Sequence, residues 1–181
     1  SCGQSVVRPE GEAMSYCVNA ACPAQLVRLL EHFVGKGAMD IEGMGGKQSV
    51  MLIENGMVND VSDLYILDRE ALLALDRMAE TSVANLLASI ERSKNRPLAR
   101  VLIGLGIAHV GSEVARLLAR QFHTIDALVE ANDESLIAIP SIGSKIAESI
   151  VTYFENKGNR RVIEKLRAAG VRLADEVPVK V

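Results

Sequence analysis

The feature that most constrains the fold is a short segment, Ile139–Ala147, that recurs upstream in three altered forms. Its apolar run stops at Pro140, turns through Ser-Ile-Gly143, and restarts with apolar residues at three- and four-residue steps. This pattern predicts two helices joined by a tight hairpin. We expect Gly143 to take the positive φ that such a turn needs, and Ala147 to let another helix approach closely.

The copies are nearly in phase. The hairpins end at positions 45, 79, 111 and 143, at intervals of 34, 32 and 32 residues, and a fixed period of this size indicates a repeated supersecondary unit. The segment that starts at Glu70 also resembles in sequence the segment that starts at Glu134, 64 residues later. This longer repeat suggests two pairs of units. Unit two has Ala79 in place of the turn glycine, and a positive φ there would cost about 1 kcal/mol.

Composition favours a mostly α-helical protein. Of the 181 residues, 49% are hydrophobic and 24% charged, which is typical of a globular chain. Only 3% are aromatic, so the core must be built from aliphatic side chains, whereas strand-rich folds usually contain more aromatic residues and threonine.

The net charge of −3 argues against a nucleic-acid binder that acts through bulk positive charge. Two segments are nevertheless locally basic: residues 92–100 carry four basic residues and no acid, and residues 157–172 carry six basic residues against Glu164 alone. We read them as local basic faces on an acidic chain. The alternative is that they are ordinary solvated helix faces.

Residues 1–23 differ from the rest and contain all three cysteines, Cys2, Cys17 and Cys22. Turns at Gly3 and Gly11 predict a small two-stranded knuckle. The spacing resembles a four-cysteine zinc ribbon whose first pair would be Cys-x2-Cys, with the partner of Cys2 lying ahead of Ser1. We therefore expect one zinc site, incomplete in this chain. An odd number of cysteines argues against a disulfide framework.

No apolar run approaches the roughly 18 residues of a membrane span, and the first residues lack a signal-peptide layout. We expect a soluble, cytoplasmic monomer with no membrane partner.

A hairpin that leads directly into a helix leaves N–H groups without intrahelical partners at the positive end of the helix dipole. The natural ligand is a phosphate oxygen, and four such sites suggest duplex DNA bound without regard to sequence. The alternative is that each hairpin only connects helices, with Met44, Val110 or Ile142 filling the core. The candidate DNA-binding residues are Gly43, Gly45, Gly46, Lys47, His109, Gly111, Ser112, Gly143, Ser144 and Lys145.

Enzyme chemistry is hard to find. Gly43–Lys47 lacks the spacing of a phosphate-binding loop, and Gly104–Gly106 lacks the third glycine and the preceding strand of a dinucleotide fingerprint. None of the three histidines forms a catalytic arrangement with a nucleophile or carboxylate. We expect no catalytic residue and no small-molecule substrate in this chain.

Several motifs together resemble the zinc finger and helix-hairpin-helix region of bacterial NAD-dependent DNA ligases, over roughly residues 1–173. The resemblance implies a partial four-cysteine zinc finger at 1–23 and a linking helix at 24–37. It also implies four helix-hairpin-helix repeats over 38–172, with hairpins near 43–45, 77–79, 109–111 and 141–143, and a linker tail at 173–181. The motifs are Cys2-Gly3, Arg8–Ala13, Cys17-x-Asn-x-x-Cys22–Gln25, His32-Phe33, Ala38–Gly45, Leu105-Gly106-Ile107-x-His109–Gly111 and Asn159-Arg160.

The resemblance also implies a function. In that family this region grips nicked duplex DNA during replication and repair, while other domains bind NAD and Mg and form the phosphodiester bond. The catalytic Lys-x-Asp-Gly motif is absent here, so we expect this chain alone to be inactive, and it contains no BRCT domain. Two alternatives stay open: a helical protein-interaction scaffold, favoured by the net negative charge, and the DNA-binding module of another repair enzyme.

Overall fold

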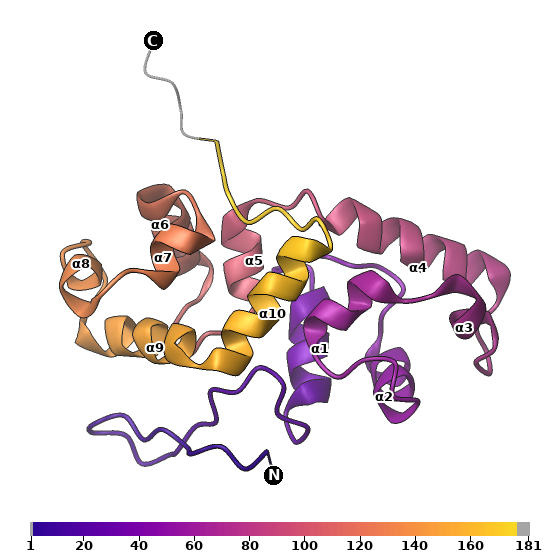
Figure 1. The fold of residues 1–181 in the computed structure, drawn as a ribbon, viewed down its shortest axis with the longest axis horizontal. Helices are drawn as coiled ribbons and strands as arrows, with labels where there is room; N and C mark the ends of the chain where they lie inside the picture. Colours follow the sequence, from indigo (N-terminus) through magenta and orange to yellow (C-terminus); the bar gives the residue numbers. More distant parts are fainter. Residues whose placement is uncertain (1, 177–181) are drawn as a thin grey trace.

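The computed structural model describes residues 2–176 and is almost entirely helical (Figure 1). Residues 2–176 contain no β-strand and only two isolated β-bridges. The mostly α-helical prediction is thereby confirmed. The helices are α1 (Leu26–Val34), α2 (Gly46–Glu54), the 3-10 helix η1 (Val61–Ile66), α3 (Arg69–Leu73), α4 (Glu80–Ser93), α5 (Leu98–Gly104), α6 (Ser112–Phe122), α7 (Ile125–Val129), α8 (Asp133–Ile137), α9 (Ser144–Glu155) and α10 (Lys157–Ala168).

The four predicted hairpins join α1 to α2, α3 to α4, α5 to α6 and α8 to α9. Figure 1 shows the first two units on one side of the molecule and the last two on the other, with α10 crossing between them. Helix α10 contacts both η1 and α9, and α1 contacts α5, so these elements connect the two pairs.

The core is aliphatic, as the composition predicts, with Phe33 and Phe154 the largest fully buried side chains. The residues four positions after each hairpin are all buried, with 0% exposure at Ser49, Val83, Ala115 and Ala147. Where α1 crosses α5, a Cβ added to Gly104 would lie 3.0 Å from Cδ2 of Phe33. A glycine is needed there because the two helices approach so closely.

Short helices begin where the sequence places their polar caps. The side chains of Asp60, Asp68, Thr124 and Asn132 each accept a hydrogen bond from a backbone N–H in the first turn that follows. The last helix ends before Gly170, which has the positive φ of 87° expected after a helix C-terminus.

Some side chains of the basic segments hold the structure together, whereas others, such as Arg92, Arg160 and Arg161, are exposed as the prediction of basic faces requires. The Arg96 guanidinium donates to the carbonyl oxygens of Met39 and Asp40, and that of Arg100 to those of Ala38 and Lys36. The loop after α1 leaves these carbonyls without helical partners, so the two arginines satisfy them.

The second basic segment also holds elements together. The Lys165 ammonium on α10 lies 2.7 Å from carboxylate oxygens of both Asp60 and Asp63, and Arg167 lies 2.6 Å from Asp126. Burial alone would raise the pKa of Asp63, but hydrogen bonds from Lys165 and from two backbone N–H groups lower it on balance. This ion triad joins α10 to η1, and so joins the two halves of the molecule.

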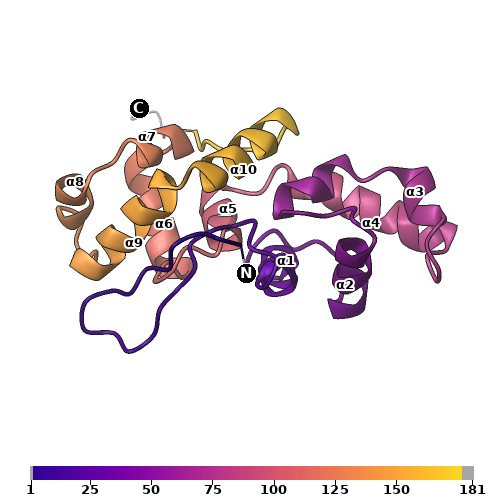
Figure 2. The ribbon, with the colours of Figure 1, turned by 60° about the horizontal axis from the view of Figure 1, so that its bottom comes forward.

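Residues 5–16 form a narrow ribbon in which the N–H groups of Val7 and Tyr16 each donate to the other residue's carbonyl at 2.7 Å. Figure 2 shows this ribbon extending beneath α6 and α9. At the other end of the chain, the first residues of the predicted tail pack against the helices. Leu173 is buried, and the Asp175 carboxylate accepts the N–H of Leu98. The rest of that tail, residues 177–181, lies outside the described residues.

None of the helices within residues 2–176 combines the length and apolar character needed to cross a lipid bilayer.

Candidate nucleic-acid interface and metal centre

The four hairpins share one backbone conformation. Their first residues have positive φ and their third residues, which precede the helix, are extended. The positive φ angles are 88° at Gly43, 66° at Arg77, 65° at His109 and 75° at Ser141. The extended residues are Gly45, Ala79, Gly111 and Gly143, with φ of −101°, −79°, −88° and −87°. The four hairpins therefore keep the same backbone conformation although their sequences differ.

This geometry corrects the expectation that the third hairpin residue supplies the positive φ. Gly143 is extended, and Ala79 has an ordinary φ, so unit two is not strained at that alanine. The strain falls two residues earlier, where Arg77, His109 and Ser141 take a conformation that costs a non-glycine residue about 1 kcal/mol.

The middle residue of each hairpin faces inward. Val110 and Ile142 are buried, and Met44 and Met78 are partly buried against the core. The hairpins are thus helix connections anchored by an apolar side chain, as the alternative interpretation predicts. This anchoring also leaves the residues on either side at the surface.

Helices α2, α4, α6 and α9, which follow the hairpins, have no side-chain cap at their N-termini. By contrast, α3, α7, α8 and α10 are each capped by a side chain. In α2, Gln48 accepts the N–H of Gly45 instead. The uncapped first turns are exposed, so their N–H groups and the positive end of the helix dipole are open to an anion.

The predicted side chains lie at these exposed turns. Lys47, Lys145, Ser112 and Ser144 are all exposed. Acidic side chains approach two of the hairpins. The Nε2 of His109 lies 3.2 Å from Oε1 of Glu12, and a Cβ added to Gly46 would lie 2.5 Å from a carboxylate oxygen of Glu31.

Hairpins 1 and 2 border one groove. A Cβ added to Gly43 would lie 3.6 Å from Cβ of Leu86 on α4, so the first hairpin packs closely on the second unit. Arg77 and Arg92 line the groove beside Gly43. Sequence reasoning did not select these two arginines, although Arg77 stands at the position that His109 occupies in unit three.

A second cleft lies between the ribbon and the helices that pack beside it. Its walls come from the ribbon, α1, hairpin 3 and α9, and they include His109 and Lys145. The structure thus brings together candidate residues from units three and four, and it places them next to the cysteine-bearing segment.

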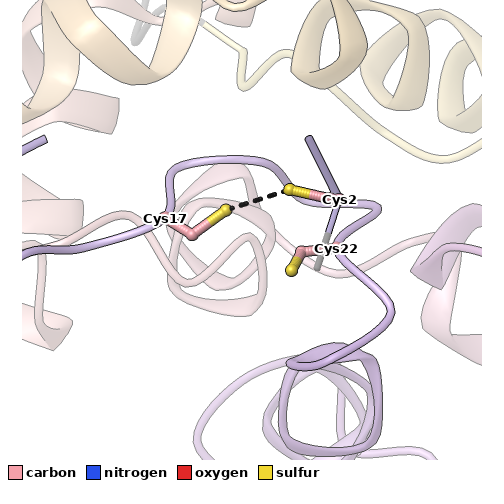
Figure 3. A group of neighbouring side chains, drawn as sticks. All are labelled: Cys2, Cys17 and Cys22. Carbon is pink, nitrogen blue, oxygen red and sulfur yellow. Dashed lines mark hydrogen bonds between the residues drawn. The ribbon is translucent and has the colours of Figure 1, made fainter. Parts of the chain in front are cut away.

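The three cysteines converge, as their spacing predicts (Figure 3). Their sulfur atoms all lie within 4.8 Å of one another, with Sγ of Cys2 and Sγ of Cys17 3.5 Å apart. Cys22 is buried and the other two are partly exposed.

The environment of the thiols differs. Hydrogen bonds, first from the Asn19 side chain and then from the Gln4 backbone, lower the pKa of Cys2 to about 6, whereas burial raises the pKa of Cys17. Of these two thiols, Cys2 is therefore the one that loses its proton more readily.

This donor set fits zinc. Zinc binds thiolate sulfur at about 2.3 Å in a tetrahedron, which places neighbouring sulfurs a little under 4 Å apart. Three sulfurs within 4.8 Å need only small shifts to reach that arrangement. They could supply three ligands of a structural zinc site.

The hairpin geometry defines a helix-hairpin-helix protein, and the family model of the helix-hairpin-helix motif matches residues 100–163. The family model of the NAD-dependent DNA ligase C4 zinc finger domain matches residues 1–24, around the cysteine cluster. Over these residues the chain matches the zinc finger and helix-hairpin-helix region of NAD-dependent DNA ligases.

Curated relatives agree with this assignment. The chain is 52% identical over 179 residues to a DNA ligase of Dehalococcoides mccartyi strain CBDB1, covering 98% of this chain and 26% of the relative. It is 49% identical over 170 residues to one of Syntrophus aciditrophicus, covering 94% of this chain and 25% of the relative. A third, from Pelotomaculum thermopropionicum, is 47% identical over 180 residues, covering 99% of this chain and 26% of the relative. The chain spans about a quarter of the length of these relatives.

Proposed function

We propose that this chain binds duplex DNA at a nick, without sequence preference, through the backbone N–H groups of its hairpins. The observation that carries the proposal is the shared start of the four helices after the hairpins: each begins without a side-chain cap, at an exposed turn. Phosphate oxygens would accept hydrogen bonds from the free N–H groups of these first turns, and the helix dipoles would favour the negative charge. Phosphates carry no base identity, so the binding is independent of sequence.

The residues that would make these contacts are those of hairpins 1, 3 and 4. Backbone contacts would come from the hairpin glycines, Lys47 and Lys145 would add charge, and Ser112 and Ser144 would donate hydroxyl hydrogen bonds. For unit two, the groove beside Gly43 suggests a different contribution. There Arg77 and Arg92 would reach the backbone of the same duplex with their side chains.

Zinc belongs to this function as a structural ion. We propose that Cys2, Cys17 and Cys22 hold one Zn²⁺, with a fourth ligand outside the described residues. The ion would fix the ends of residues 2–22 and so hold the ribbon against hairpin 3. Its chemistry is that of a closed structural site, with no part in a reaction.

The relatives are DNA ligases, and we propose the same activity for the whole protein to which this region belongs. In that setting the chain grips the nicked duplex in replication and repair, in the cytoplasm, as a monomer. NAD and Mg would be bound by other parts of the whole protein.

Fluorescence anisotropy with labelled duplexes tests the proposal. Two nicked duplexes of unrelated sequence should bind with the same affinity, because the contacts are to phosphate. A single strand of the same length is the control and should bind more weakly, since it does not present two phosphate backbones at fixed spacing. Affinity that depends on base sequence, or equal affinity for the single strand, would contradict it.

A further inference from the structure

Asn159, in the first turn of α10, is 0% exposed and yet fully hydrogen-bonded. Its side-chain Nδ2 donates to the carbonyl oxygens of Val18 at 2.7 Å and Tyr153 at 3.0 Å. Its Oδ1 accepts the N–H of Ala20 at 2.8 Å. A buried amide with both donors and its acceptor engaged fixes the backbone segments that it contacts.

Those segments are the cysteine loop and the end of α9. Val18 and Ala20 lie between Cys17 and Cys22, so Asn159 holds the loop that brings these two thiols together. Tyr153 is in the last turn of α9, which begins at the fourth hairpin. One side chain therefore connects the cysteine cluster to the fourth unit.

The neighbouring Asn156 reaches the other side of the cluster. Its Oδ1 accepts the backbone N–H of Asn159 at 3.1 Å, and its Nδ2 donates to the side chain of Gln4 at 2.6 Å. Gln4 lies two residues after Cys2. The junction of α9 and α10 thus touches both chain segments that supply cysteines.

We propose that Asn159 is a positioning residue for the metal site: it pre-forms the loop between Cys17 and Cys22 and fixes this loop to the junction of α9 and α10. The proposal rests on the proposed zinc binding. A loop that is already ordered loses less conformational freedom when the ion binds, so the ion binds more tightly. By linkage, the bound ion in turn stabilises the docking of the cysteine segment on unit four.

The test is Asn159→Asp, with Asn132→Asp as the matched control. In Asn159→Asp an acceptor oxygen replaces the donor that faces the carbonyls of Val18 and Tyr153. Asn132 caps α8 at an exposed site, so the same substitution there leaves the cysteine loop untouched. Competition with a chromophoric chelator should give a Zn²⁺ affinity about 10-fold lower for Asn159→Asp, and unchanged for the control.

A purely structural role would give a different result. Asn159→Asp would then lower the thermal midpoint equally with and without Zn²⁺ and leave the Zn²⁺ affinity unchanged, and this would overturn the proposal. If Asn159→Asp loses its helical circular dichroism, a Zn²⁺ titration of the unsubstituted chain followed by NMR replaces it. The side-chain amide signals of Asn159 must then shift and those of Asn132 must not, whereas unshifted Asn159 signals would overturn the proposal.

The failure of zinc binding can be told apart from the failure of this proposal. If the unsubstituted chain binds no Zn²⁺, the reaction of buried Cys22 with a thiol reagent becomes the measurement. Loosening of the loop should speed that reaction in Asn159→Asp but not in Asn132→Asp. Equal rates in the two variants would overturn the role of Asn159.

Discussion

The Nε2 atom of His109, the first residue of the third hairpin, lies 3.2 Å from the Oε1 atom of Glu12 in the N-terminal ribbon. His109 holds a positive φ of 65° at the position that glycine occupies in the first hairpin. The ribbon thus places a carboxylate at one of the turns for which we propose a phosphate contact. This carboxylate would oppose a bound phosphate, because the two groups carry like charges.

Replacing Glu12 by glutamine should strengthen DNA binding, because it removes a negative charge beside the third hairpin. A partly exposed charge of this kind changes affinity by about 2- to 5-fold at low salt. Fluorescence anisotropy at low salt measures this change in DNA affinity. Glu10→Gln is the control, since Glu10 is an exposed acid of the same ribbon. An equal gain in the two variants would mean that only net charge matters, and that Glu12 has no special position.

Replacing Gly111 and Gly143 together by alanine should weaken DNA binding without unfolding the chain. Both residues have negative φ, and a Cβ added at either meets nothing within 4 Å, so the fold accepts alanine. The two methyl groups would obstruct phosphates approaching the adjacent N–H groups and lower affinity by about 10-fold. Gly37→Ala is the control because Gly37 also has room for a Cβ and lies outside the hairpins. Unchanged affinity in the double variant would show that the backbone is not used.

Replacing Lys47 and Lys145 by glutamine should reduce the salt dependence of binding as well as the affinity. Removing one lysine–phosphate contact lowers the magnitude of the slope of log K against log salt by about 0.9. The double variant should therefore show a reduction of nearly twice that amount. Lys36→Gln, at an exposed lysine outside the hairpins, should leave the slope unchanged. A slope that falls equally in Lys36→Gln would indicate a diffuse charge effect.

Replacing Lys165 by methionine should destabilise the fold, because it leaves the buried carboxylates of Asp60 and Asp63 without their cation. Lys165 is 38% exposed, so solvent screening reduces the loss to about 1–3 kcal/mol of unfolding free energy. Urea titration measures it, with Lys157→Met as the control. A loss no larger than that of the control would mean that the triad contributes nothing.

The pH dependence of that loss follows from the two pKa shifts. The lowered pKa of Asp63 gives stability that is present above the unfolded carboxyl pKa of about 3.9 and disappears as pH falls through the folded value. The raised pKa of Lys165 gives stability that is present below about 10.4 and disappears as pH rises through its folded value. The difference between the unsubstituted chain and Lys165→Met should therefore be constant near neutrality and shrink at both extremes.

The fold is predictable from sequence because its signals are local. The tight turn of each hairpin and the caps at Asp60, Asp68, Thr124 and Asn132 depend on neighbours within a few positions. The cysteine spacing also predicts that the three thiols converge.

The features that could not be predicted from the sequence depend on contacts between residues far apart in the chain. Sequence reasoning assigns the positive φ to Gly143 rather than Ser141, because glycine is the usual residue for that conformation, whereas burial of Ile142 holds a serine there instead. It treats the basic segments as faces, but Arg96, Arg100 and Lys165 find partners more than 50 positions away. The bond from Asn159 to the cysteine loop spans 139 residues and has no local signal.

The salt dependence of DNA binding by the unsubstituted chain tests the proposed phosphate contacts most directly. Contacts to phosphates through several hairpins predict a steep linear fall of log K with log salt, with a slope of about −0.9 for each phosphate contacted. We expect the same slope for nicked duplexes of unrelated sequence. A slope near zero, or no measurable DNA binding as expected of a protein-interaction scaffold, would contradict the central claim.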